Sequence, residues 1–347
     1  MKHVLNTIFF SFILIFQICG QSDSIEIIIK NYMQKQKIPG LSIGIVKNGT
    51  TIMTKGFGYA NLEHFVPVTE KTVFRLASIS KQFFATAILK LEQDGKLSLE
   101  DNLKKYFNDA PDFWAAINIK HLLTHTSGLV REAPGYQNFE LKSDLTVIKS
   151  AYPLPLEFPT GSKYQYCNLG YFILAEIITQ VSKMPWQDYI KSELFDPAGM
   201  KDTYLTEFYP IIPHRASGYV HNNGKYVNAE PMIAIRPSGG FLSTTTDILK
   251  WEGVLLNKNI ILSQENWNRL WYPHFRTSEK QETFYGYGWV IDTVDGHKTI
   301  GHSGGNIGFR THYLRYVDKG LSIVVLTNSN NAAPIDIIKE VGRYLLK

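Results

Sequence analysis

The stretch FRLASISKQFFATAILKLEQDGK, residues 74–96, places two serines and a lysine at the start of a helical pattern. On a helix, side chains three residues apart share a face, whereas adjacent side chains point apart. Ser78 and Lys81 have the first relationship, and Ser80 and Lys81 have the second. We therefore expect the amine of Lys81 to serve Ser78, at a helix N-terminus where the helix dipole favours developing negative charge.

A lysine with its ordinary pKa is a poor base at neutral pH. Burial beside Ile79, Phe83 and Phe84, or a nearby cation, would lower the pKa of Lys81 and free its amine. The alternative is a serine that caps a helix, followed by a surface lysine. S-x-x-K is a short pattern, so the catalytic interpretation needs partners elsewhere in the chain.

Two further stretches supply such partners. Tyr166 and Asn168 lie in GSKYQYCNLGY, where a phenol near an ammonium can act as a phenolate or a proton relay, and an amide can bind both substrate and lysine. GHSGGNIGF, from Gly301, reads as a strand whose glycines allow close approach to its edge. The backbone N–H groups of Ser78 and Gly305 could then form an oxyanion hole, in which one donor lowers the barrier by roughly 3 kcal/mol.

The order of the predicted elements indicates an α/β (α+β) fold. A helix with Ile25 and Ile29 on one face precedes a hairpin that turns at Asn48-Gly49. A long, mostly helical segment follows, then antiparallel strands and a final helix over about 334–346. Because a lone hairpin is marginally stable, we expect it to join the late strands in one antiparallel sheet flanked by the N- and C-terminal helices.

This arrangement predicts one domain over residues 21–347. Its sheet lobe comprises about 21–77 and 283–347, and a large, mostly helical lobe, about 78–282, is inserted between these two parts. A cleft between the two lobes is the expected place for a site.

S-x-x-K, Y-x-N and H-x-G in this order resemble the class C β-lactamase and penicillin-binding-protein-like serine hydrolase family. HLLTHTSGL from His121, PSGGFLSTTTDILKW from Pro237 and YGYGW from Tyr285 extend the resemblance over about residues 25–345. The resemblance implies a β-lactamase/transpeptidase-like fold and an acyl-enzyme mechanism without metal or cofactor. It also implies a role for each motif residue. Ser78 is acylated, Lys81 and Tyr166 share its proton and later activate water, and Asn168 holds the substrate. The opposite wall is lined by His302, Ser303 and Gly304, and Gly305 gives the second oxyanion donor.

The chain departs from the β-lactamases of this family at one motif. They carry K-T-G where this chain has His302-Ser303-Gly304. A histidine is mostly neutral at pH 7, so it does not replace a fixed cation beside a substrate carboxylate. The H-x-G form is more similar to family members that act as esterases or peptidases. Arg310 either supplies a carboxylate contact instead or is an ordinary surface arginine.

The sequence therefore predicts a serine hydrolase that acts on ester or amide substrates, including D-amino acid peptides and, weakly, β-lactams. The rival hypothesis is a penicillin-recognising sensor or binding module that does not turn over. The joint presence of Ser78, Lys81 and Tyr166 favours turnover, because a sensor does not need the whole proton apparatus. The oligomeric state stays open.

The N-terminus is typical of a secretory signal peptide. Lys2 precedes an apolar run, and Gly20 offers a small residue before a cleavage point, so residues 1–20 are expected to be removed from a secreted or periplasmic protein. An uncleaved membrane anchor is the alternative. The formal net charge of +5 comes from scattered residues without a basic block, which argues against a nucleic-acid partner.

Two other motifs have alternative interpretations. GHSGG fits G-x-S-x-G, which would make Ser303 the nucleophile, but a strand rather than a helix is expected after it. His121 and His125 have the spacing of a helical zinc pair, but no glutamate follows the first and no third ligand is evident. We expect these two histidines to be structural.

Overall fold

The structure is a computed structural model that describes residues 23–234, 236–257 and 259–347. The predicted signal peptide, residues 1–20, lies outside the described residues. No helix within the described residues is long and apolar enough to cross a membrane.

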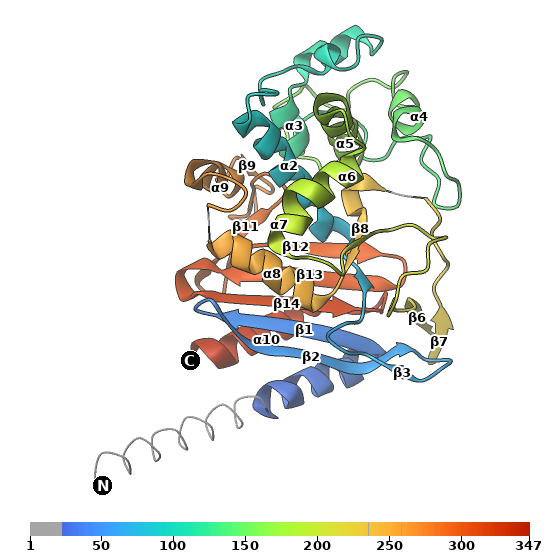
Figure 1. Ribbon diagram of the computed structural model, residues 1–347, viewed down its shortest axis with the longest axis vertical. Coiled ribbons are helices and arrows are strands. Elements are labelled where there is room, and N and C mark those ends of the chain that lie inside the picture. Colours follow the sequence, from blue (N-terminus) through green and yellow to red (C-terminus); the bar gives the residue numbers. More distant parts are fainter. Residues whose placement is uncertain (1–22, 235, 258) are drawn as a thin grey trace, which may run out of the picture.

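A large antiparallel sheet forms the centre of the protein (Figure 1), and it contains nine strands among the described residues. Their order across the sheet is β3 (Val66–Pro67), β2 (Thr50–Asn61), β1 (Gly40–Lys47), β14 (Leu321–Thr327), β13 (Phe309–Tyr316), β12 (His297–Asn306), β11 (Val290–Val294), β10 (Phe284–Tyr285) and β9 (Phe275–Arg276). β1 pairs with β14, with Leu41 opposite Thr327. The predicted union of the early hairpin with the late strands is therefore confirmed.

The hairpin between β1 and β2 turns where the sequence indicated. Asn48 and Gly49 both have positive φ, of 50° and 78°, as a two-residue type I′ turn requires. Lys47 and Thr50 pair directly across this turn. The local sequence thus sets the register of the first two strands.

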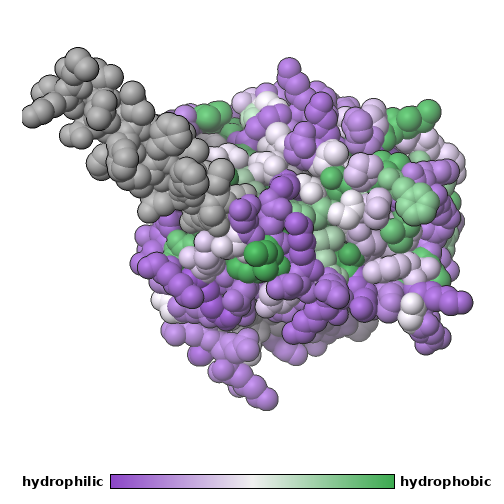
Figure 2. Space-filling view, turned by 90° about the horizontal axis from the view of Figure 1, so that it is seen from below, coloured by the Kyte–Doolittle hydropathy of each residue, from purple (hydrophilic) through white to green (hydrophobic). Residues whose placement is uncertain are grey.

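The two terminal helices cover one face of the sheet. Residues 23–36 are helical, and α10 spans Pro334–Leu346. Their apolar sides pack on inward-facing strand residues in one core cluster, which includes Ile25, Ile29, Ile43, Ile323, Val325, Ile337 and Val341. Seen from this side, the surface is mostly hydrophilic (Figure 2), because both helices turn their apolar sides toward the sheet.

The opposite face carries the other helices and the larger core. The helices are α2 (Lys81–Gln93), α3 (Ile119–Leu123), α4 (Asp144–Lys149), α5 (Leu169–Ser182), α6 (Trp186–Ile190), α7 (Asp196–Ala198), α8 (Thr245–Leu256) and α9 (Gln264–Leu270). α2 is buried at every position from Lys81 to Leu89. β14 is buried throughout, because Val324 and Leu326 face this core while its alternate residues face the terminal helices.

The fold class is confirmed, but the expected division into lobes needs refinement. A small sheet joins β4 (Phe74–Arg75), β8 (Phe241–Ser243) and β5 (Tyr204–Leu205), and β6 (Tyr219–Asn222) pairs with β7 (Lys225–Asn228). In addition, β9 belongs to the large sheet although it precedes residue 283. These strands are two to four residues long, too short to show an alternating pattern in the sequence.

Candidate active site

Ser78 lies in a tight turn at the start of the most buried helix. The turn is the 3-10 helix η1 (Ala77–Ser80), and α2 begins at Lys81 rather than at Ser78. In a 3-10 helix, residues three apart are eclipsed, so the predicted alignment of Ser78 with Lys81 is even closer here than on an α-helix. Ala77 has a positive φ of 49°, a strained conformation for alanine.

The surroundings hold this turn from several sides. Thr311 Oγ1 donates a 2.9 Å hydrogen bond to the carbonyl oxygen of Leu76. A Cβ atom on Gly304 would lie 2.2 Å from that same oxygen. We predicted that glycines on this strand admit a substrate, but at Gly304 the group that approaches is the chain's own backbone.

Lys81 is fully buried beneath Ser78. Its Nζ lies 3.3 Å from Ser78 Oγ, 3.0 Å from Asn168 Oδ1 and 2.8 Å from the carbonyl oxygen of Ser238. Burial lowers the pKa of Lys81 well below its ordinary value, and the positive charge of Arg236 lowers it further. Both causes were predicted from the sequence in general terms, but Arg236 was not identified.

Asn168 is oriented by a second set of contacts. Its Nδ2 donates a 2.5 Å hydrogen bond to Glu132 Oε1, which also forms a 3.2 Å ion pair with Arg236. Because Nδ2 is used in this way, Oδ1 faces Lys81. Glu132, Arg236 and the neighbouring Arg131 were missed in the sequence, since isolated charged residues in loops carry no pattern.

Tyr166 completes the group around Ser78. Its ring centroid lies 4.7 Å from Lys81 Nζ, and the guanidinium carbon of Arg131 lies 5.4 Å from the same centroid. Burial raises the pKa of Tyr166, and a side-chain hydrogen bond with Ser78 lowers it by less. Of the two states that we considered for this phenol, the environment favours the neutral relay over the phenolate.

Ser80 has a different role. Its hydroxyl is buried and accepts a 3.2 Å hydrogen bond from the backbone N–H of Phe241. That bond ties the end of the turn to β8. Of the two serines, only Ser78 faces the amine.

His302 lies behind Tyr166 rather than on the cavity wall, with the two ring centroids 6.2 Å apart. Its Nδ1 lies 2.6 Å from the carbonyl oxygen of Ser303, so Nδ1 carries the proton and Nε2 accepts from the hydroxyl of Tyr285 at 3.0 Å. Burial is the main cause that lowers the pKa of His302 to about 3. The ring is therefore neutral, and no cation occupies this position.

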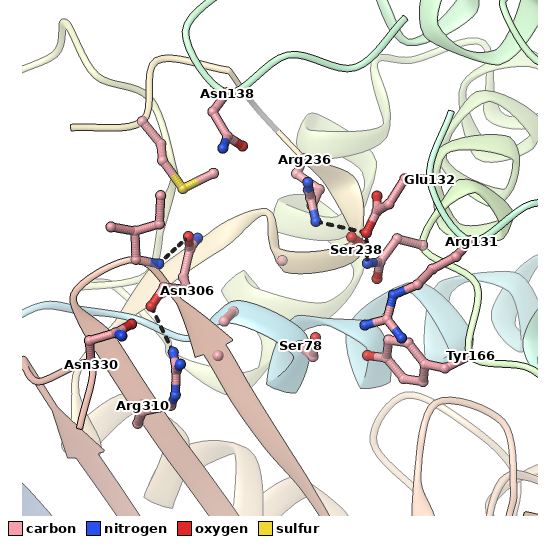
Figure 3. A pocket seen from close by; sticks show the side chains of 16 residues that line it. Ser78, Arg131, Glu132, Asn138, Tyr166, Arg236, Ser238, Asn306, Arg310 and Asn330 are labelled. Atoms are coloured by element: carbon pink, nitrogen blue, oxygen red, sulfur yellow. Dashed lines mark hydrogen bonds and ion pairs between the residues drawn. The ribbon is translucent and has the colours of Figure 1, made fainter. Parts of the chain in front are cut away.

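A cavity of about 380 Å³ opens above Ser78 (Figure 3). Tyr166, Arg131 and Glu132 stand on one side of it, and Asn306, Arg310 and Asn330 stand on the other. Gly305 lines this cavity, whereas His302, Ser303 and Gly304 do not. Arg310 Nη1 donates to the carbonyl oxygens of Asn306 and Phe309, at 3.0 and 3.1 Å.

The structure also bears on the alternative motifs. Ser303 lies in the middle of β12, paired with His312, and no strand-to-helix turn follows it. His121 Nδ1 accepts from the backbone of Asn118 at 3.0 Å, and His125 Nδ1 accepts from the backbone of Cys167 at 3.1 Å. Neither motif has the surroundings that its catalytic or metal-binding interpretation requires.

Comparisons with known proteins agree with this fold. The sequence matches the model of the family described as Beta-lactamase over residues 25–342. It is 30% identical to "Penicillin-binding protein 4*" of Bacillus subtilis over 314 residues, which is 81% of this chain and 68% of the relative. The chain spans about two thirds of the length of the curated relatives that it matches.

Two solved structures extend the comparison. The octameric penicillin-binding protein homologue from Pyrococcus abyssi is 29% identical, with a TM-score of 0.85 over 94% of this chain and 77% of that one. The D-amino acid amidase from Ochrobactrum anthropi SV3 complexed with D-phenylalanine has a TM-score of 0.83 at 23% identity, over 94% and 99%. The second likeness shows the fold alone.

Proposed function

The chain belongs to the Beta-lactamase family of serine hydrolases, and we propose that it hydrolyses esters or amides through an acyl-enzyme on Ser78. The observation that carries this proposal is the set of three contacts around Lys81 Nζ. A neutral amine has two N–H bonds and one lone pair. Asn168 Oδ1 and the carbonyl of Ser238 can only accept, so they take both N–H bonds. The lone pair is left for the hydroxyl of Ser78.

Acylation then follows from this arrangement. Ser78 Oγ attacks the substrate carbonyl carbon while its proton moves to Lys81 Nζ. The oxyanion that forms is held by the backbone N–H groups of Ser78 and Gly305. The proton passes through the hydroxyl of Tyr166 to the leaving nitrogen or oxygen, and the carbon–heteroatom bond breaks.

Deacylation uses the same groups in reverse. Water attacks the acyl carbon, and the pair of Tyr166 and Lys81 removes its proton. The acid product leaves with Ser78 protonated again. No step needs a charge at His302, whose ring is neutral.

The neutral His302 favours esters and amides over β-lactams as substrates, because a fixed cation is missing at this position. The likeness to a D-amino acid amidase adds amides of D-amino acids to the substrates that should be tested. We also propose that the protein is exported after removal of residues 1–20. N-terminal sequencing of protein purified from the culture medium or the cell envelope tests this second proposal.

The function is tested with a panel of 4-nitrophenyl esters, D-amino acid amides and nitrocefin, assayed with wild type and Ser78→Ala. We expect steady-state turnover of at least one ester or amide by wild type, with loss in the variant. Intact mass after reaction with a fluorophosphonate should show one adduct on Ser78. A stoichiometric burst without steady state would favour the penicillin-recognising sensor instead.

A further inference from the structure

A second cavity adjoins the catalytic one. It has a volume of about 380 Å³ and shares Met232 and Ile307 with the cavity above Ser78. Arg75 of β4, three residues before Ser78, lines it together with Arg215. Leu242 and Phe309 give it an apolar part.

The two arginines line the same cavity, and their guanidinium groups donate to backbone carbonyl oxygens. Arg75 Nη2 donates to the carbonyl oxygen of Met232 at 3.3 Å, and Arg215 Nη2 donates to that of Glu207 at 2.8 Å. Arg215 Nε is buried and has no hydrogen-bond partner. Burial and then the charge of Arg215 lower the pKa of Arg75 to about 10, so the two cations repel each other.

Within residues 23–234, 236–257 and 259–347, no carboxylate forms an ion pair with Arg75 or Arg215. The charge of Glu207 acts on Arg215 from a greater distance, and it offsets only part of the lowering of the pKa of Arg215 by burial. Glu63 and Glu230 line the same cavity, but both are exposed, and Glu63 accepts from Asn228 Nδ2 at 3.0 Å instead. Guanidinium groups that face a cavity without a carboxylate partner are suited to bind an anion.

The position of this cavity indicates which part of a substrate reaches it. Tyr166, which protonates the leaving group, stands on one side of Ser78, and Asn306 stands on the other (Figure 3). Ile307 follows Asn306 and borders both cavities. The second cavity therefore lies on the acyl side of the scissile bond.

We propose that this cavity is an acyl-side subsite in which Arg75 and Arg215 bind a carboxylate at the far end of the substrate. The apolar lining accommodates the chain between that carboxylate and the scissile carbonyl. The proposal rests on the proposed function, since it assigns part of the acyl donor of the same reaction. The substrate class is thus an acyl group with a distal acid.

The test uses 4-nitrophenyl monoesters of straight-chain dicarboxylic acids and the same compounds with the free acid methylated. We expect wild type to prefer the charged ester of at least one chain length, by roughly tenfold or more in kcat/KM. Arg215→Gln should bring this preference close to one, mainly through KM of the charged ester. Arg276→Gln, on exposed β9, is the matched control and should keep the preference.

Two results would contradict the proposed subsite directly: wild type shows no preference for the charged ester, or Arg215→Gln keeps the wild-type preference. A preference that is lost only in Arg310→Gln would also contradict it, because the carboxylate would then bind in the catalytic cavity. Hydrolysis of the methylated esters reports the proposed function separately. If wild type hydrolyses none of them, calorimetric titration with adipate tests the subsite independently of hydrolysis. Binding by wild type that is weakened about tenfold or more in Arg215→Gln supports it, and equal or absent binding contradicts it.

Discussion

Lys81 Nζ lies 3.3 Å from Ser78 Oγ, and two acceptors that cannot donate occupy the other directions around the same nitrogen. Burial makes the ammonium form costly at this position, so the pKa of Lys81 falls. In the proposed mechanism, the contact with Ser78 is that of a base with its proton donor. This relationship determines how the chemistry responds to mutation and pH.

Lys81→Met should lower kcat/KM by about 10²–10⁴-fold, because the general base is lost while the side-chain volume is kept. The folded state should lose little stability, since a buried amine is replaced by an apolar side chain. Steady-state kinetics and thermal unfolding measure the two effects. Lys90→Met is the matched control on the same helix, because Lys90 pairs with Asp94 at the surface. Retained activity in Lys81→Met would show that another group takes the proton.

The activity should depend on pH through Lys81. The neutral form of Lys81 is the active one in this mechanism. We therefore expect kcat/KM to be high at pH values above the pKa of Lys81 in the folded protein, and to fall as the pH drops through that pKa. Arg236 lowers this pKa, so Arg236→Met should raise it and move the acid limb of the profile to higher pH. Arg236→Lys keeps a positive charge, so its acid limb should lie close to the pH at which the wild-type limb lies.

The same profile tests whether His302 contributes. With a pKa of about 3, His302 stays neutral throughout the accessible range and should add no step near pH 6. An acid limb that does not move in Arg236→Met, or that disappears in a His302 variant, would contradict the assignment to Lys81.

Tyr166→Phe should lower kcat/KM by about 10²-fold or more while leaving the unfolding temperature nearly unchanged. The phenyl ring keeps its packing over Lys81, and only the hydroxyl that we propose as the proton relay is lost. Tyr164→Phe is the matched control, because the rings of Tyr164 and Tyr166 both pack near His125, with centroid distances of 5.9 and 4.3 Å. An equal loss of kcat/KM in both variants would indicate a general disturbance of the packing around His125 rather than the loss of a proton relay.

Gly304→Ala and Gly305→Ala should differ in how much they destabilise the folded protein. A Cβ atom on Gly304 would lie 2.2 Å from the Leu76 carbonyl oxygen, so the turn that carries Ser78 must shift, at a cost of roughly 1–3 kcal/mol or more. On Gly305 the nearest atom is Arg310 Nη1 at 3.4 Å, an ordinary contact. Thermal unfolding should therefore show destabilisation in the first variant and little in the second. The reverse order would refute this account of β12.

Much of the fold could be predicted because its signals are local or periodic. The Asn48-Gly49 turn needs two positive φ angles that only a few residue types adopt readily. The final helix begins at Pro334, where a proline is favoured, and its apolar face has helical spacing. The short strands β4 and β5 carry no such signal, because pairing with β8, far along the chain, defines them, and β9 is too short to show an alternating pattern.

The sequence by itself determined which serine lies beside the lysine, because a separation of three residues in one turn brings the two side chains together whatever surrounds them. Only the tertiary structure decided how far from its ordinary value the pKa of that lysine is lowered. Glu132 and Arg236 come from loops far from Ser78 in the chain, and they meet around Asn168 because the helices and the sheet pack there. A pKa depends on burial and on the charges that packing brings within a few ångströms, and no pattern along the chain encodes that distance.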